Sequence, residues 1–199
     1  MKRNQKTAFV FSAVLFLIAV AYAVLYHLLI PADPKRFIIA VFILIVGLLV
    51  AFFANWLVRK MPDSNVARLL VLGVIAFIVA SPFISASMKQ VTWSRFGFMV
   101  YGVVPIPLFD FTVDQQGLLG LRAKTHTITV DEVQALVNSE TTVIVIALGW
   151  DSVSHVDESI YFDFRNMEIH ELSTPEAFEK YNELTKEGVK VVLIGHTTC

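Results

Sequence analysis

Two side chains at the end of the sequence have the types required for nucleophilic catalysis. His196 and Cys199 lie three positions apart, and an imidazole that activates a thiol is a common pair of base and nucleophile. The α-carboxylate of Cys199 is a negative charge beside the thiol, however, and such a charge disfavours the reactive thiolate. We therefore favour docking of this terminus on the fold, or binding of a partner, over catalysis.

A second group of reactive side chains lies at and after Gly149-Trp150-Asp151. This tripeptide follows Thr142–Leu148, an apolar run typical of a buried strand, and open α/β sheets bind ligands beyond the carboxyl ends of such strands. His155 and Asp157 follow Asp151 closely in the sequence, so one interpretation of these three side chains is a metal-binding or acid-base role. A single imidazole with two carboxylates on a loop is more typical of a solvated turn. We predict Gly149, Trp150 and Asp151 as ligand- or partner-binding residues, without a metal.

Tyr181 and Asn182 form a third candidate pair, on the last predicted helix. Tyr181 shares an apolar helical face with Ala177 and Leu184, at spacings of four and three residues. One interpretation is a core tyrosine whose hydroxyl has a hydrogen-bond partner. The other is a pocket wall shared with the region of Gly149, and both interpretations stay open.

The sequence lacks the motifs of the common enzyme classes. It contains no GxSxG, P-loop, GxGxxG, HExxH or CxxC motif, and its single cysteine excludes an intrachain disulfide. We therefore predict no catalytic residues, no metal and no cofactor, and we favour a non-enzymatic function.

The first half of the chain is predicted to cross a membrane. Hydrophobic residues make up 56% of the chain, above the usual share of about 45–50% for globular proteins. Thr7–Ile30, Phe37–Val58 and Leu69–Met88 contain no Asp, Glu, Lys or Arg over 24, 22 and 20 residues. About 20 apolar residues span a bilayer core, and the first run is longer than the apolar region of a signal peptide. We predict a domain of three transmembrane helices over residues 1–92, in a multi-pass protein of the cell membrane.

Charge divides the chain at the same place. Residues 1–92 carry nine Lys and Arg against two Asp and Glu, whereas residues 93–199 carry seven against fifteen. An acidic domain is repelled by phosphate, which excludes nucleic acid as a partner. Short flanks also set orientation, because positive residues favour the cytoplasmic side. Six basic residues on one side, against three or four on the other, favour a cytoplasmic N-terminus and an extracytoplasmic C-terminal domain. They are Lys2, Arg3, Lys6, Arg59, Lys60 and Arg68 against Lys35, Arg36 and Lys89, with Arg95 as the fourth if the start of the domain is counted.

Residues 93–199 are predicted to form a compact α/β domain with a mixed β-sheet. Two capping boxes, beginning at Thr129 and Ser173, start helices that run to about Asn138 and Glu187. Alternating or continuous apolar runs predict six strands: Phe96–Val104, Ile106–Val113, Leu118–Arg122, Thr142–Leu148, Met167–Leu172 and Val189–Ile194. A strand, a helix and a further strand in this order imply a parallel crossover.

The α/β half resembles a known family. The stretches that carry the resemblance are Phe96-Gly97, Tyr101-Gly102, Asp110–Asp114, His126 before Thr129–Val133, Val143–Gly149, Ser173–Ala177, Tyr181–Leu184, Glu187-Gly188 and His196–Cys199. From Arg95 to Cys199 the chain is similar to the small domain shared by mitochondrial complex I assembly factor three and an adipogenesis-associated mammalian protein. Where that family has a small, Gly-rich loop, this chain has Gly149-Trp150-Asp151.

The resemblance implies a mixed sheet with helices beside it, no established catalysis, and a role in assembling a membrane respiratory complex. Soluble relatives are cytosolic or in the mitochondrial matrix, which favours the opposite side of the membrane to the charge count. We expect a membrane-anchored, non-enzymatic interaction or assembly module that contacts the lipid bilayer and a membrane protein partner. The alternative is a small-molecule-binding or enzymatic domain with a pocket near Gly149-Trp150-Asp151 and Tyr181-Asn182.

Overall fold

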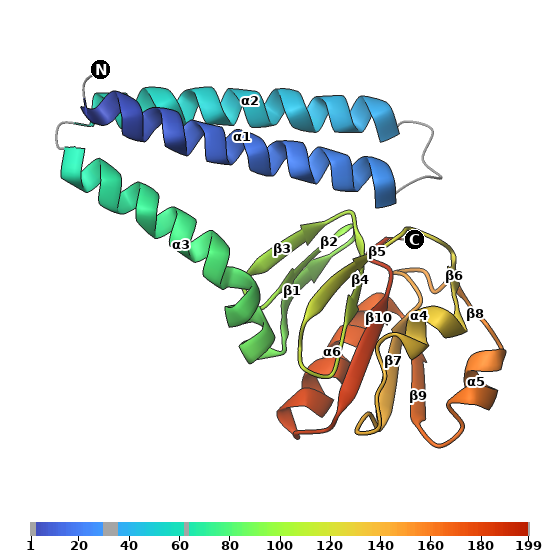
Figure 1. Cartoon of the computed structure of the whole chain (residues 1–199). Helices are drawn as coiled ribbons and strands as arrows, with labels where there is room; N and C mark the ends of the chain where they lie inside the picture. Colours follow the sequence, from blue (N-terminus) through green and yellow to red (C-terminus); the bar gives the residue numbers. More distant parts are fainter. Residues whose placement is uncertain (1–2, 30–35, 62–63, 199) are drawn as a thin grey trace. The chain divides into compact units, whose positions relative to one another are not determined.

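The chain folds into two compact units. The computed structural model describes residues 3–29, 36–61 and 64–198, and Figure 1 shows the elements in chain order. The helical unit is Met1–Ala80 and the α/β unit is Ser81–Cys199. Lys2, Lys35 and Cys199, which the sequence-based predictions use, lie outside the described residues.

Long apolar helices form the first part of the chain, as predicted. They are α1 (Arg3–Leu29), α2 (Arg36–Lys60) and α3 (Ser64–Met88). Among the described residues, three helices are long and apolar enough to cross a membrane, over Gln5–Leu28, Phe37–Lys60 and Arg68–Met88.

Small residues bring α1 and α2 close together. A Cβ atom on Gly47 of α2 would lie 2.2 Å from the Cβ of Ala19 of α1, so only glycine fits at this crossing. A hydrogen bond from Asn55 Nδ2 to Ser12 Oγ, 3.2 Å long, also joins the two helices.

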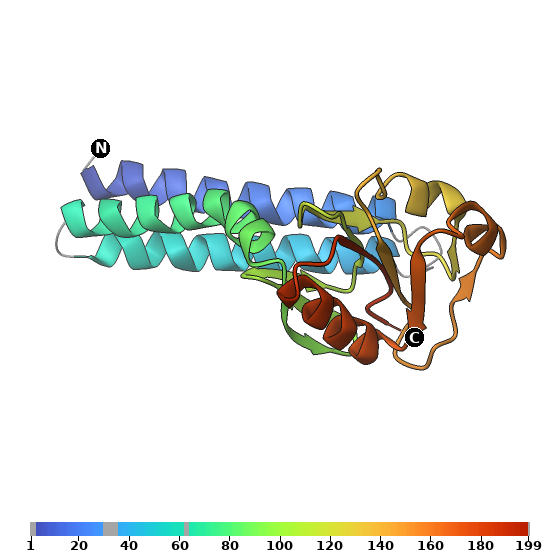
Figure 2. The same cartoon turned by 90° about the horizontal axis from the view of Figure 1, so that it is seen from below.

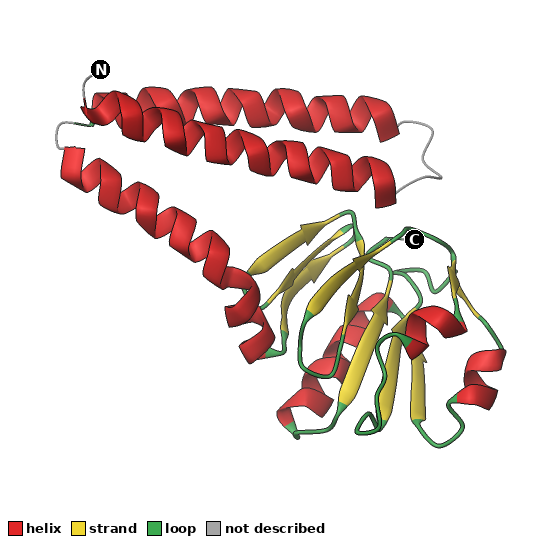
Figure 3. Cartoon of the chain, viewed as in Figure 1, coloured by secondary structure: helices red, strands yellow, loops and turns green. Residues whose placement is uncertain are grey.

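The α/β unit contains the predicted mixed sheet. Its order is β5-β4-β10-β7-β9, in which β7, β9 and β10 are parallel and β4 runs antiparallel to both β5 and β10 (Figure 3). A separate antiparallel sheet has the order β1-β2-β3, and β6 pairs with β8. The strands are β1 (Val91–Arg95), β2 (Phe98–Tyr101), β3 (Val104–Pro107), β4 (Asp110–Val113), β5 (Leu119–Arg122), β6 (Thr127–Ile128), β7 (Val143–Ala147), β8 (His155–Val156), β9 (Glu168–Leu172) and β10 (Val191–Gly195).

Helices cover both faces of the five-stranded sheet. On one face, α4 (Val130–Gln134) and α5 (Ser159–Asp163) pack against alternate residues of β7 and β10, with Val133 and Ile160 fully buried. On the other face lies α6 (Thr174–Lys186), as Figure 2 shows. Phe178 of this helix contacts Phe111 of β4 at 5.4 Å between ring centroids. The core therefore consists of two apolar layers with the sheet between them.

The α/β unit begins at Ser81, inside α3, so it includes the last turns of this helix. Ser85 is buried, and its Oγ accepts a hydrogen bond from the amide of Val103 at 3.1 Å. Gly102 lies against the same serine, since a Cβ there would be 2.5 Å from Ser85 Cα. The last turns of α3 therefore pack with the sheet β1-β2-β3.

The N-terminal strands differ from the prediction because the backbone turns at three positions. Gly97 and Gly102 have φ of 71° and 56° and lie on either side of β2, so the predicted strand Phe96–Val104 is shortened to Phe98–Tyr101, and β1 before it was not predicted. Leu108, with φ of 63°, separates β3 from β4. The short elements β6, β8 and α5 were not predicted, and α4 ends at Gln134 rather than near Asn138.

Candidate functional site

Three ionisable side chains meet at one edge of the five-stranded sheet. Asp110 begins β4 and pairs in register with Arg122, which ends β5. Phe111 pairs with Gly195 of β10, so His196 follows at the level of Asp110. This edge is also the carboxyl end of the parallel strands, where ligands bind in open α/β sheets.

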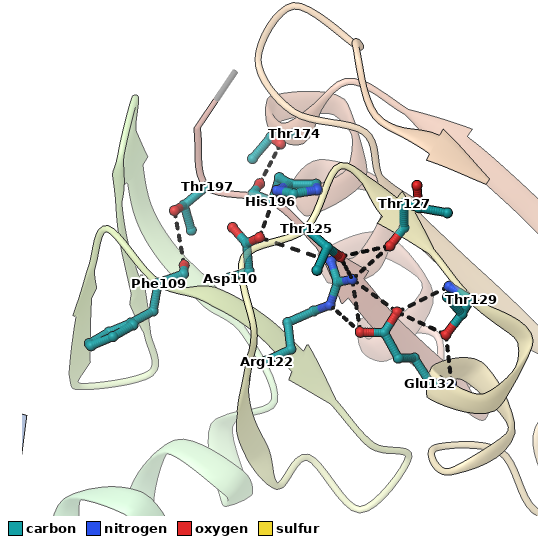
Figure 4. A network of polar contacts seen from close by, with 10 residues as sticks. All are labelled: Phe109, Asp110, Arg122, Thr125, Thr127, Thr129, Glu132, Thr174, His196 and Thr197. Atoms are coloured by element: carbon teal, nitrogen blue, oxygen red, sulfur yellow. Dashed lines mark hydrogen bonds and ion pairs between the residues drawn. The ribbon is translucent and has the colours of Figure 1, made fainter. Parts of the chain in front are cut away.

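Asp110 lies between an imidazole and a guanidinium, as Figure 4 shows. Its Oδ2 is 2.7 Å from His196 Nδ1 and 4.0 Å from Arg122 Nη1. The His196 contact has the distance of an ion pair without the geometry of a hydrogen bond. The side chains of Asp110 and His196 are both fully buried.

Glu132 of α4 completes this group, which we call the edge cluster: Asp110, Arg122, Glu132 and His196. Arg122 donates from Nε to Glu132 Oε1 and from Nη2 to Glu132 Oε2, both at 2.9 Å, in the planar bidentate arrangement that favours arginine. It also donates to the carbonyl of Thr127 at 3.1 Å. Glu132 has a second role, because its Oε2 accepts from the amide of Thr129 in the predicted capping box. The edge cluster therefore joins β5 to the start of α4.

The edge cluster keeps unused hydrogen-bonding capacity. Among the residues that the structure describes, Asp110 Oδ1, Arg122 Nη1 and His196 Nε2 are buried without a hydrogen-bond partner. Asp110 Oδ2 and His196 Nδ1, although 2.7 Å apart, also lack a hydrogen bond, so both ring nitrogens of His196 are buried without one. Because the carboxylate and the imidazole are enclosed, the cluster is a buried network in this conformation, not an open site.

Sequence reasoning named His196 as a candidate but did not name Asp110 and Arg122, which lie beside it. The sequence signal for this contact was a carboxylate and a guanidinium at the ends of two apolar strands. Charged residues are rarely buried unless they are paired, so such positions indicate a buried pair. Cys199, its proposed partner, lies outside the described residues. His126 lies beside His196 instead, with the two rings stacked at 5.9 Å between centroids.

The structure brings Gly149 close to His196, through Thr174 at the start of α6. The Thr174 amide donates to the carbonyl of Gly149 at 2.9 Å, and the Thr174 hydroxyl donates to the carbonyl of His196 at 2.7 Å. Trp150 turns toward Phe96, with 6.4 Å between ring centroids, and Asp151 is exposed. No group of three His, Cys, Asp or Glu residues in the described part of the chain could hold a metal ion.

Tyr181 is a buried core residue two turns further along α6. The hydroxyl of Tyr101 donates to the carbonyl of Gly117 at 3.1 Å, so the Tyr181 hydroxyl, 3.2 Å away, donates to Tyr101. Burial raises the pKa of Tyr101 to about 12 and also raises the pKa of Tyr181, so both phenols are neutral at pH 7. Tyr101 and Tyr181 therefore pack together in the core between α6 and β2.

Asn182 connects α6 to the first strand of the α/β unit. Its Oδ1 accepts from the Val91 amide and its Nδ2 donates to the Val91 carbonyl, both at 2.8 Å. A side-chain amide is the right group for this contact, because it offers one acceptor and one donor to one residue's backbone. The side chain thus has a structural role where α3 leads into the sheet.

Asn182→Ala is expected to lower the free energy of unfolding of the α/β unit by about 1–3 kcal/mol, because it leaves two partly buried backbone groups of Val91 unpaired. Thermal unfolding of the full chain in mild detergent, followed by near-ultraviolet circular dichroism, measures the loss. The matched control is Asn166→Ala on an exposed turn, where the change should stay within about 0.5 kcal/mol. Equal effects of the two substitutions would contradict the structural role of Asn182.

Comparisons with known proteins identify neither a family nor a function. A search of protein-family models finds no match, and a search of curated proteins finds none. Two solved structures are similar to this chain. One is a conserved hypothetical protein, PH1505, from Pyrococcus horikoshii, with 16% identity and a TM-score of 0.48 over 55% of this chain and 99% of that chain. The other, MT938, has 24% identity and a TM-score of 0.47 over 55% of this chain and 98% of that chain.

Proposed function

We propose that the chain is a membrane-anchored, non-enzymatic interaction module that holds its α/β unit at a membrane surface, where the unit binds a protein of a membrane complex. The observation that carries this proposal is the direct passage of α3 from an apolar, membrane-length segment into the α/β unit. We further propose the cell membrane as its location, with the α/β unit on the extracytoplasmic side, from the distribution of basic residues.

The junction after α3 contains no flexible linker. The apolar segment of α3 extends over Arg68–Met88, and β1 begins at Val91. Lys89 lies in the turn between them, and its Nζ donates to the carbonyl of Gln115 at 2.8 Å. With Ser85 buried against Gly102, the end of the helix is part of the folded unit. A tether that only localises a domain does not need this packing, whereas a module that presents one surface to a membrane-bound partner does.

Three further arguments favour partner binding over the small-molecule alternative. Tyr181 and Asn182, offered as a pocket wall, form hydrogen bonds to Tyr101 and Val91. The resemblance to the assembly-factor family supports a role in assembly, as a proposal. The excess of acidic residues from 93 to 199 favours a partner with a basic surface.

Affinity capture through an N-terminal tag, from native membranes in mild detergent, tests this proposal. We expect a second protein in constant ratio to the chain, and its recovery should fall as the salt concentration rises, because salt screens contacts between exposed charges. Membranes that contain the untagged chain provide the control for background binding. Recovery of the tagged chain alone, in a detergent that keeps known membrane complexes intact, would count decisively against an interaction module.

A further inference from the structure

The antiparallel sheet β1-β2-β3 has one buried and one outward face. Its register pairs Ser94 with Met99 and Met99 with Ile106, and Met99 and Ile106 are almost fully buried. Because side chains alternate along a strand, the neighbouring positions share the opposite face. We call this set the outer face: Trp93 and Arg95 of β1, Phe98 and Val100 of β2, and Pro105 and Pro107 of β3.

The outer face is apolar except for one cation. The side chain of Trp93 is 48% exposed, its ring meets Phe98 edge-on at 5.3 Å, and the Arg95 guanidinium lies 5.6 Å above it. Phe96, in the turn after β1, is 63% exposed. Tryptophan and other aromatic side chains with basic residues nearby are the composition of protein segments at the membrane-water interface.

Charge within the α/β unit is strongly asymmetric. Residues 81–109, which contain the end of α3 and the sheet β1-β2-β3, have two basic residues and no Asp or Glu. Residues 110–199 have six basic residues and fifteen acidic ones. An anionic lipid surface attracts the first segment and repels the second, so the electric field of the bilayer would itself orient the unit.

The outer face is also within reach of the bilayer. The α/β unit includes the end of α3, and only Lys89 and Gln90 separate that helix from β1. Trp93 is two residues after Val91, so it lies no further than about 7 Å along the extended strand from the start of β1. The headgroup layer is about 5–8 Å thick on each side of the hydrocarbon core.

We propose that the outer face rests on the headgroup layer of an anionic bilayer, with Trp93 at the depth of the upper acyl chains and Arg95 among the phosphates. This inference rests on membrane anchoring by α1, α2 and α3, but not on the identity of any protein partner. In this arrangement the acidic remainder of the unit faces away from the lipid. The partner surface of the proposed module is therefore the acidic side.

A full chain with a single tryptophan tests the position of Trp93. Trp56→Phe and Trp150→Phe leave Trp93 as the only indole, and the protein is reconstituted in vesicles of phosphatidylcholine and phosphatidylglycerol. We expect lipids brominated near the top of the acyl chain to reduce Trp93 emission about twofold, as for an indole at the interface. Aqueous iodide should quench it weakly.

The control places an exposed indole on the acidic side. Phe162 of α5 is 73% exposed, and it lies next to Asp163. Phe162→Trp, combined with removal of all three native tryptophans, should give emission that iodide quenches strongly and brominated lipid does not. Thermal transitions of both proteins establish that they are folded before quenching is compared.

Any other pattern of quenching would overturn the proposal that the outer face rests on the headgroup layer. If iodide quenches Trp93 as strongly as the Phe162→Trp control, the outer face is in water. If neither iodide nor brominated lipid quenches Trp93, a protein covers the outer face instead of lipid.

Arg95→Glu tests the electrostatic contribution of Arg95 to binding of the outer face to anionic lipid. This substitution should weaken quenching by brominated lipid in vesicles with phosphatidylglycerol, and change it less in vesicles of phosphatidylcholine alone. Equal quenching of Arg95→Glu and its parent in the anionic vesicles would remove the role given to anionic headgroups.

Discussion

Arg122→Met is expected to lower the free energy of unfolding of the α/β unit by about 3–5 kcal/mol, because removing one partner from a buried ion pair leaves the others uncompensated. Without the guanidinium, Asp110 keeps only His196 as a partner, and Asp110 is fully buried. Glu132 loses both hydrogen bonds from Arg122, and the carbonyl of Thr127 loses its donor. We therefore expect α4 to separate from the end of β5.

Arg165→Met is the matched control for this loss. Arg165 is exposed on the surface, and its guanidinium lies over the ring of Phe162 at 5.9 Å. A contact of this kind at an exposed site is worth about 0.5–1 kcal/mol, so the control should cost little. Thermal or denaturant unfolding of the full chain in detergent compares the two variants.

A double substitution separates loss of charge pairing from loss of packing. Asp110→Leu with Arg122→Met removes both charges and is expected to recover part of the stability lost in Arg122→Met alone, because apolar side chains can replace a buried ion pair. If the double variant were less stable than Arg122→Met by the full cost of Asp110→Leu alone, the two residues would not be coupled. The edge cluster would then not be one network.

Gly102→Ala is expected to lower the free energy of unfolding of the α/β unit by about 2–5 kcal/mol, the sum of a left-handed backbone penalty and steric overpacking. Gly102 has φ of 56°, and a Cβ there would lie 2.5 Å from Ser85 Cα and 2.8 Å from Ser85 Oγ. The obstructing atoms belong to the backbone and first side-chain atoms of a helix, which cannot move aside alone. The turn between β2 and β3 must then separate from α3.

Gly188→Ala is the matched control for Gly102→Ala. Gly188, after α6, has φ of 80°, and a Cβ at this position would meet no other atom within 4 Å. Gly188→Ala should therefore lower the free energy of unfolding by only about 1–2 kcal/mol, the cost of the left-handed conformation itself. Hydrogen exchange of the Val103 amide, which donates to Ser85 Oγ, provides a local measurement: it should become faster in Gly102→Ala and stay unchanged in Gly188→Ala. Equal losses of stability in the two variants would show that contact with Ser85 is not what requires glycine at position 102.

Local patterns in the sequence determined most of the elements. The three apolar helices follow from uninterrupted runs that only a helix can satisfy within a membrane. The start of α6 follows from the capping box of Ser173 and Glu176, and the buried strand β7 follows from its β-branched run. Each of these signals is contained within a few neighbouring residues, so no distant contact is needed to detect it.

Tertiary structure alone decided which residues meet. The edge cluster joins Asp110, Arg122 and His196 because β10 lies beside β4, a pairing of residues 80 to 84 positions apart in the chain. Asn182 became a link to Val91 for the same reason, across 91 positions. The division of the chain inside α3 likewise depends on the contact between Ser85 and Gly102. Composition and periodicity report whether a side chain will be buried, but its partner is set by strand order and register, which depend on how distant segments of the chain pack together.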